Sequence, residues 1–401
     1  MPYRSIVRDT SARPENALLL WCARAWTDTE SAAQIEALLQ HNLDWEYLLR
    51  MAQRHALMPL LFWHLNTTCP EAVPSAPWQH LREHFHTNAR HNLRLTGELL
   101  KLLRLLATHN IPALPFKGPV LAMAVYGDLA LRQFVDLDLL VHPQDVLQVK
   151  TLFHTHGYHP VFSLTDAQVI ALLQRYHEYP FVHQDRVGSV DLHWALHPRS
   201  LPTPLDSECM WERLEPVVLG GQKVLTFAPE ETLVHLCIHG TRHLWCKLQL
   251  LGDVARLLGT YGSIDWERVM AQAHALGSAR MLYLGLRLAC DLLDVTLPKE
   301  VWRRVQDDPV VPGLAARVRT RLFRDTPAVL EGWQSAWFYI GAMEIPGRHR
   351  RVFCDTLCAP TPADFAFVLL PASLFPLYYV LRPLRLSGKY ARRLLRRCLG
   401  P

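Results

Sequence analysis

Three aspartates in two apolar segments are the residues whose types and spacing point most clearly to chemistry. Asp136 and Asp138 lie in the apolar run 134–141, and Asp191 lies in a similar run, 189–196. Side chains two positions apart in a strand point to the same face, so Asp136 and Asp138 are expected to project together. Two carboxylates on one apolar face repel each other and are costly to bury unless a cation lies between them. The pattern therefore predicts a divalent-metal site.

Mg2+ is the ion that this site favours, with Mn2+ as an alternative. Mg2+ prefers oxygen ligands, keeps several waters and completes its shell with substrate phosphates, so a phosphate-bearing partner is expected. The competing interpretation is an exposed strand with two solvated aspartates. The apolar character of 134–141 disfavours it.

The elements around these aspartates predict a small α/β unit. Lys117 and Gly118 separate a predicted strand from a helix that has Pro119 at its first position. The predicted strands are 111–116, 134–141 and 189–196, and the predicted helices are 119–131, 144–156 and 166–176.

Helical periodicity dominates on both sides of this unit. Predicted helices are 17–25, 31–40, 45–54 and 78–108 before it, and 229–244, 248–258, 266–275 and 279–293 after it. We therefore predict an α+β protein that is predominantly helical, with a small mixed-sheet core. The predicted regions are an N-terminal helical region (1–108), the core (109–200), a C-terminal helical domain (201–363) and an apolar segment with a basic tail (364–401).

Charge and cysteine content restrict the class of protein. The net charge is +5, but residues 382–401 hold seven Lys or Arg and no acid, so the remaining chain is close to neutral and no DNA partner is expected. The nine cysteines include no Cys-x-x-Cys pair, and no secretory signal is visible, so a cytoplasmic location is expected. Two prolines interrupt the uncharged run 365–381, which makes a membrane-spanning helix unlikely to form there.

The motifs resemble a known family. Phe116-Lys117-Gly118, Tyr126-Gly127-Asp128, Arg132, the Asp136-Leu-Asp138 strand and Val190-Asp191-Leu-His193-Trp194 are similar to the uncharacterised bacterial nucleotidyltransferases, within the polymerase-beta-type nucleotidyltransferase superfamily. His239, Trp245, Asp253 and the ending 381–385 add to the resemblance. The similarity covers most of residues 80–400.

The resemblance implies a two-metal nucleotidyltransferase core. Asp136 and Asp138 would bind both Mg2+ ions, and Asp191 would complete the site near the attacking hydroxyl. The superfamily usually has Gly-Gly or Gly-Ser in the phosphate loop, whereas this chain has Lys117-Gly118-Pro119. Here Gly118 would allow close backbone approach and Lys117 would add a point charge.

Two further residues are assigned to nucleotide binding. Arg132 could reach a triphosphate oxygen, or it could pair with Asp136 or Asp128. His193 lies on the same strand face as Asp191, where it could steer substrate or carry a proton. His177, Glu178 and His183 precede the same strand and carry less weight, because the chain holds 21 His.

Histidines at 235, 239 and 243 form a rival candidate for a metal site. Their i, i+4, i+8 spacing places three imidazoles along one helical stripe, but the stripe spans about 12 Å, too far for one ion to reach all three. Packing within a helical domain that caps the cleft is therefore favoured.

The tail from Leu384 to Leu399 has the pattern of a basic amphipathic helix. It could contact an anionic membrane at its cytoplasmic face, or RNA phosphates, or it could dock on the protein and leave its arginines solvated. RNA is the weaker functional option because no aromatic residues are interleaved for base stacking.

The sequence thus predicts Mg2+-dependent transfer of a nucleoside monophosphate from an NTP such as ATP, with release of pyrophosphate. The acceptor would be a hydroxyl or phosphate group on a small molecule, peptide or RNA. The alternatives are phosphoryl transfer or tRNA modification by the same metal site, and a degenerate nucleotide-sensing protein.

Overall fold

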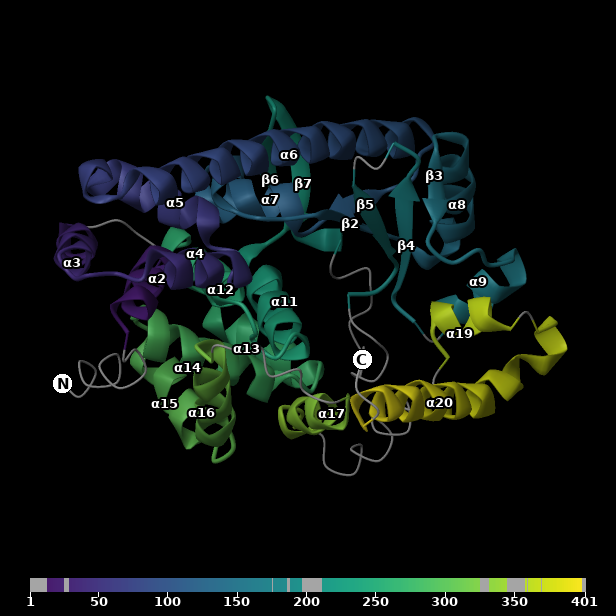
Figure 1. The fold of residues 1–401 in the computed structure, drawn as a ribbon. Helices are drawn as coiled ribbons and strands as arrows, with labels where there is room; N and C mark the ends of the chain where they lie inside the picture. Colours follow the sequence, from purple (N-terminus) through teal and green to yellow (C-terminus); the bar gives the residue numbers. More distant parts are fainter. Residues whose placement is uncertain are drawn as a thin grey trace.

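The computed structural model describes residues 13–24, 29–174, 176–185, 188–196, 211–324, 332–344, 358, 360–368 and 370–398. Within these residues the protein is predominantly helical, with one five-stranded sheet and one two-stranded sheet (Figure 1). This arrangement confirms the predicted α+β class.

The five-stranded sheet is mixed and has the order β1-β2-β5-β4-β3. Its only parallel pair is β2 with β5, while the other neighbours are antiparallel. The strands are β1 (Ala113–Pro115), β2 (Asp136–Val141), β3 (Tyr158–Pro160), β4 (Glu178–His183) and β5 (Ser189–His193). Strands β1, β2 and β5 lie within the predicted strands. Strands β3 and β4 were not predicted, because their short sequences contain His and Pro and lack a clear apolar alternation.

One face of this sheet is buried by helices. Leu137 and Leu139 of β2 share an apolar cluster with Leu95 and Leu99 of α6 (Ser75–Thr108). Helices α8 (Val146–Thr155) and α9 (Asp166–Leu173) contribute to the same cluster. Since side chains alternate along a strand, burial of these leucines directs Asp136 and Asp138 to the opposite face.

The opposite face carries a smaller apolar cluster of Leu114, Phe116, Leu140, Leu196 and Phe227. Phe227 ends a hairpin of β6 (Leu214–Leu219) and β7 (Gln222–Phe227), which the analysis did not predict. Helix α11 (Pro229–Arg242) follows directly, and its His235 ring lies edge-on to Phe116 at 5.2 Å between centroids. The hairpin and α11 therefore flank the aspartate-bearing face.

The predicted helix 119–131 is wrong as a single element. The segment instead forms α7 (Gly118–Leu121), a π-helical stretch η3 (Ala122–Tyr126) and a 3-10 turn η4 (Leu129–Leu131). Gly127 adopts φ +70°, in the left-handed region, and ends the helical run. Asp128 then caps the 3-10 turn through the backbone N–H of Ala130.

The N-terminal and C-terminal helical regions share one hydrophobic core. The N-terminal members are α2 (Pro14–Ala23), α3 (Thr29–Leu39), α4 (Trp45–Arg54) and α5 (Met58–Thr68). The C-terminal members are α11, α12 (Leu248–Thr260), α13 (Trp266–Ala275), α14 (Ala279–Leu293), α15 (Lys299–Asp307), α16 (Val311–Leu322) and α17 (Gly332–Gly341). The two regions thus support the sheet as one helical body (Figure 1).

The C-terminal segment packs beside the sheet. It contains α19 (Pro362–Phe367), the 3-10 helix η6 (Ala372–Leu377) and α20 (Tyr378–Cys398). Phe365, Phe375 and Tyr378 join the cluster behind the sheet. Asp364 accepts hydrogen bonds from both Arg382 and Arg385 of α20. These contacts anchor the start of the basic helix.

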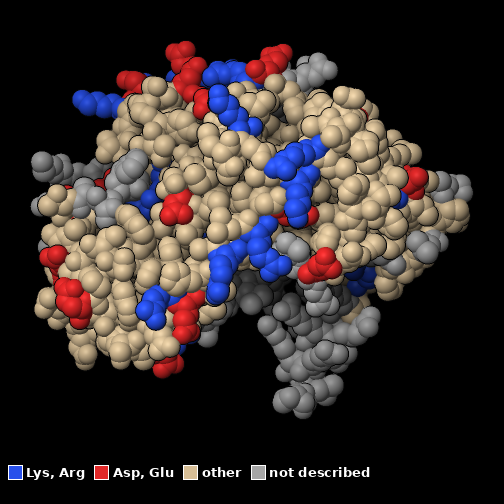
Figure 2. All heavy atoms as spheres, turned by 90° about the horizontal axis from the view of Figure 1, so that it is seen from above, with Lys and Arg blue, Asp and Glu red and all other residues tan. Residues whose placement is uncertain are grey.

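Charge on the face above α6 is mixed. In this view, Lys and Arg side chains form a short diagonal row, with Asp and Glu at several places around it (Figure 2). Most of the face is uncharged, so this side presents no broad surface of one sign.

Candidate active site

The three predicted carboxylates lie on one face of two adjacent strands. Asp138 of β2 is the register partner of Asp191 of β5, and Asp136 is the partner of Ser189. Register partners in a sheet project to the same side, and Asp136 is two residues from Asp138. Pairing of β2 with β5 therefore brings together carboxylates that are distant in sequence.

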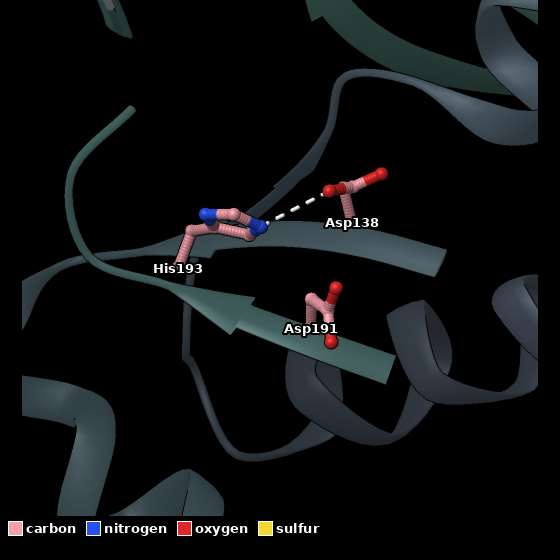
Figure 3. A group of neighbouring side chains, drawn as sticks. All are labelled: Asp138, Asp191 and His193. Atoms are coloured by element: carbon pink, nitrogen blue, oxygen red, sulfur yellow. Dashed lines mark hydrogen bonds and ion pairs between the residues drawn. The ribbon is translucent and has the colours of Figure 1, made fainter. Parts of the chain in front are cut away.

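Asp138, Asp191 and His193 form the compact part of this face. One ligand atom from each residue lies within 4.8 Å of the others, and His193 Nε2 lies 3.0 Å from Asp138 Oδ1 (Figure 3). Asp136 shares the face but lies outside this three-residue group. The donor set that the fold gathers most closely is thus two carboxylates and an imidazole.

Lys117 supplies a cation to the same group. Its Nζ lies 2.6 Å from Asp138 Oδ1, and both side chains are largely buried. Gly118, with φ +52°, approaches β2 so closely that an added Cβ would lie 3.2 Å from the carbonyl oxygen of Asp136. The requirement for glycine here is therefore steric as well as conformational, and it holds Lys117 against β2.

The negative charges of the three carboxylates on this face are compensated to different degrees. Burial raises the pKa of Asp191 to about 7, with a further contribution from the negative charge of Asp138. Burial also raises the pKa of Asp136, again reinforced by Asp138. For Asp138, burial acts in the same direction but is outweighed by the charge of Lys117 and the hydrogen bond from His193, so its pKa lies well below the usual range.

These residues fit a divalent metal ion. Lys117 compensates one carboxylate, while the raised pKa values of Asp136 and Asp191 mark an excess of acid that more positive charge would relieve. Carboxylate oxygens and an imidazole nitrogen at this spacing are ordinary ligands for such an ion.

A fourth acid, Glu178, lies beside the group. Glu178 of β4 is the register partner of His193, and its Oε2 lies 3.7 Å from His193 Nδ1 and 3.3 Å from His177 Nε2. Burial would raise its pKa, but His177 and His193 lower it to about 2. His193 thus lies between two carboxylates, Asp138 and Glu178. The sequence alone places Glu178 before β5 without showing that it reaches His193.

The three histidines of the α11 region form a row that begins at this site. Ring centroids are 5.9 Å apart for His235 and His239, and 4.4 Å for His239 and His243. Burial, and then the charge of Lys117, lower the pKa of both His235 and His239 well below the usual range. In the part of the chain that the structure describes, none of the three belongs to a three-donor metal group. The three imidazoles are therefore neutral and packed side by side, rather than arranged as a second metal site.

Arg132 occupies a buried ion pair with Asp253 of α12. Its Nε and Nη2 donate to the two carboxylate oxygens at 2.9 and 3.0 Å, and the Tyr126 hydroxyl donates to Asp253 at 2.7 Å. The carboxylate partner of Arg132 is thus Asp253, whereas the sequence predicted Asp136 or Asp128 as the alternatives to a triphosphate oxygen. These contacts of Tyr126 and Arg132 with Asp253 join the segment before β2 to the helical body.

Two asparagines of α6 hold the same segment from the other side. Asn88 and Asn92 both donate to the backbone carbonyl of Arg132, at 3.4 and 2.8 Å, and they also bind the carbonyls of Ala130 and Leu129. Spacing of four residues places both amides on one side of the helix. Sequence periodicity alone offered no signal for this role, because it depends on which backbone lies opposite α6.

The structure describes only part of the amphipathic tail. α20 extends over Tyr378–Cys398, but the side chains from Lys389 onward lie outside the described residues. Of the tail's basic residues, Arg382 and Arg385 pair with Asp364. Among the helices that the structure describes, none has the length and apolar character needed to span a bilayer.

The chain is similar to one protein family and to several solved structures. A family model described as "Uncharacterised nucleotidyltransferase" matches residues 41–294. The solution structure of the antibiotic-resistance factor ANT(2'')-Ia matches with 16% identity and a TM-score of 0.32, over 48% of this chain and 95% of that chain. An antigenic nucleotidyltransferase-like protein from Paracoccidioides brasiliensis matches with 15% identity and a TM-score of 0.30, over 56% and 92%. No curated protein matches.

Proposed function

This chain belongs to the uncharacterised nucleotidyltransferase family, and on that premise we propose that it transfers a nucleoside monophosphate from an NTP to a hydroxyl or phosphate acceptor, releasing pyrophosphate. The observation that carries the proposal is the pairing of Asp138 with Asp191 across β2 and β5, with Lys117 held against the same face. Two carboxylates and an ammonium group on one face of the sheet support binding of a metal ion together with a triphosphate.

Asp136, Asp138 and Asp191 are the residues proposed to hold two Mg2+ ions, with Mn2+ as an alternative. His193 Nε2 is close enough to Asp138 and Asp191 to join the ligand set. When bound, the ions would neutralise the triphosphate and favour ionisation of the acceptor hydroxyl.

The side chains of the protein have distinct proposed tasks. Lys117 Nζ and the backbone at Gly118 would bind phosphate oxygens beside β2. Asp191 would polarise or deprotonate the acceptor hydroxyl through its carboxylate. In the empty site, His193 orients Asp138 through its Nε2. In the loaded site, His193 would contact the nucleotide. We assign Arg132 to positioning of β2, because Asp253 occupies its Nε and Nη2.

Transfer of label from NTPs tests the reaction type. Purified protein is incubated with each of the four NTPs, labelled at the α-phosphate, together with metabolite, RNA or protein fractions of a cell extract. We expect label on an acceptor and unlabelled pyrophosphate as the second product. In a parallel set labelled at the γ-phosphate, transfer of that label alone would support phosphoryl transfer instead. Label confined to the tRNA fraction would support tRNA modification. Binding without transfer would support the nucleotide-sensing alternative.

We also propose that the C-terminal segment contacts an anionic membrane from its cytoplasmic side. Leu374, Leu377, Val380 and Leu384 are 44–65% exposed along η6 and α20, while Phe375 and Tyr378 face the core. This segment therefore has apolar side chains on its exposed side as well as on its buried side. Such a pattern is unusual for a surface helix that contacts only water. The sequence that follows is strongly basic, which suits anionic headgroups.

A further inference from the structure

Lys117 makes a direct ion pair with a proposed metal ligand. Its ammonium lies 2.6 Å from Asp138 Oδ1, with side-chain exposures of 15% for Lys117 and 3% for Asp138. Among the residues that the structure describes, no other Lys or Arg forms an ion pair with Asp136, Asp138 or Asp191. In the absence of metal, Lys117 is therefore the principal counter-ion of this face.

The backbone beneath Lys117 is fixed while its side chain is adaptable. Gly118 adopts φ +52° against the carbonyl of Asp136, so this part of the loop has little room to shift. A lysine has a flexible four-carbon stem and a compact charge that can change partners without movement of the backbone. Lys117 also begins the loop that is proposed to bind phosphate.

A divalent ion bound by Asp138 would share its carboxylate with the Lys117 ammonium. Two cations on one carboxylate repel each other, so each weakens binding of the other. A triphosphate beside the loop offers Lys117 another set of anionic oxygens. The ammonium could then leave Asp138 without becoming unpaired in a low-dielectric site.

We propose that Lys117 is an exchangeable counter-ion, which neutralises Asp138 in the empty site and transfers to the triphosphate when metal and nucleotide bind together. This inference rests on the proposed function and specifies how the site selects its ligand. The site would discriminate against free metal ions and favour the metal–triphosphate complex. By linkage, each ligand would strengthen binding of the other.

Replacement of Lys117 by Met tests the exchange, because it should change two binding affinities in opposite directions. Mn2+ binding is measured by calorimetry and by loss of the free Mn2+ EPR signal, first with Mn2+ alone and then with the Mn2+–tripolyphosphate complex. Lys117→Met should bind Mn2+ alone at least about tenfold more tightly than wild type, the size of effect that one adjacent charge commonly has on a carboxylate. The same variant should bind the complex more weakly than wild type.

Three controls isolate the role of the charge. Lys117→Arg keeps the positive charge and should bind free Mn2+ as weakly as wild type. Lys117→Gln is a second neutral variant, for use if the Met variant does not fold, and should behave as Lys117→Met. Lys150→Met removes a similar ion pair, at 2.7 Å from Asp166 and away from the site, and should change neither affinity.

Other results would overturn the inference. If Lys117 is purely structural, its replacement should weaken binding of both free Mn2+ and the complex. If Lys117 only binds phosphate, its replacement should leave the affinity for free Mn2+ unchanged. If Asp138→Asn abolishes Mn2+ binding while Lys117→Met leaves it unaltered, the exchange fails but the proposed metal site stands. If neither wild type nor Lys117→Met binds Mn2+ in either form, the proposed function fails as well.

Discussion

Asp138 and Asp191 face each other across the one parallel strand pair of the sheet, as direct register partners on β2 and β5. Each is flanked in sequence by buried residues that face the opposite side, including Leu137, Leu139, Val190 and Leu192. A one-residue slip of either strand would carry its carboxylate into the apolar core. The packing of α6 behind the sheet therefore fixes the register on which the site depends.

Removal of either paired carboxylate should abolish transfer. Asp138→Asn and Asp191→Asn are each expected to lower kcat by on the order of 10²- to 10³-fold or more, because a charged group aimed at the reacting centre is lost. Turnover of labelled NTP and Mn2+ affinity are the measurements. Asp166→Asn, which removes a surface carboxylate of α9, serves as the control and should remain active. Activity near that of wild type in Asp191→Asn would contradict the role of Asp191 as base and ligand.

Asp191 should also make the stability of the metal-free protein depend on pH. Its pKa rises from 3.8 to about 7 in the folded state, so the fold favours the protonated form. The resulting stability is fully present below about pH 4 and is lost as the pH rises through about 7. Relative to Asp191→Asn, wild type should therefore lose on the order of 3 kcal/mol of unfolding free energy across this range.

Urea denaturation of both proteins in EDTA, from pH 4.5 to 8, measures this difference. Saturating Mn2+ should remove the penalty from wild type, because the ion compensates the ionised carboxylate, and should have less effect on Asp191→Asn. Parallel pH profiles for the two proteins in EDTA would show that Asp191 ionises at its ordinary pKa.

Loss of the buried Arg132–Asp253 ion pair should destabilise the fold. Arg132→Met leaves the Asp253 carboxylate buried without its cation and is expected to cost about 3–5 kcal/mol. The matched control is Arg303→Met, which breaks an exposed pair with Glu300 at 2.9 Å and should cost about 0–1 kcal/mol. Chemical denaturation of both variants gives the comparison. Unchanged stability together with weakened NTP binding would instead support the role of Arg132 in nucleotide binding.

The exposed stripe of η6 and α20 should determine membrane binding. Wild type is expected to sediment with vesicles that contain phosphatidylserine, but not with phosphatidylcholine vesicles, and added salt should reduce binding. Val380→Glu combined with Leu384→Glu should weaken binding by about tenfold or more, since both apolar contacts and charge attraction are lost. Leu93→Glu, at a similarly exposed leucine of α6, is the control. Equal binding by wild type and the double variant would exclude this surface.

Much of the site could be predicted because its signals are local. Alternation of Asp136 and Asp138 with leucines requires only the period of a strand, so the sequence indicated both the strand and its two faces. The sequence also predicted Lys117 and Gly118 at the junction of a strand and a helix, although α7 is shorter than the predicted helix 119–131. Separation of the helical regions from the small sheet followed from the change in hydrophobic period, as did most helix boundaries.

Other features depend on contacts that no local pattern encodes. Glu178 reaches His193 only because β4 pairs with β5, and Asp253 meets Arg132 from a helix more than a hundred residues later. Likewise, the compact donor group includes His193 and leaves Asp136 outside, which strand periodicity could not decide.

The sequence by itself determined that three aspartates lie on strands and that Lys117 and Gly118 lie between a strand and a helix. Side-chain alternation and turn chemistry act over only a few residues. Only the tertiary structure decided which of these groups touch, that Lys117 neutralises Asp138, and that Arg132 supports the fold. The physical reason is that strand register and helix packing set distances between distant residues, and electrostatic interactions depend steeply on those distances.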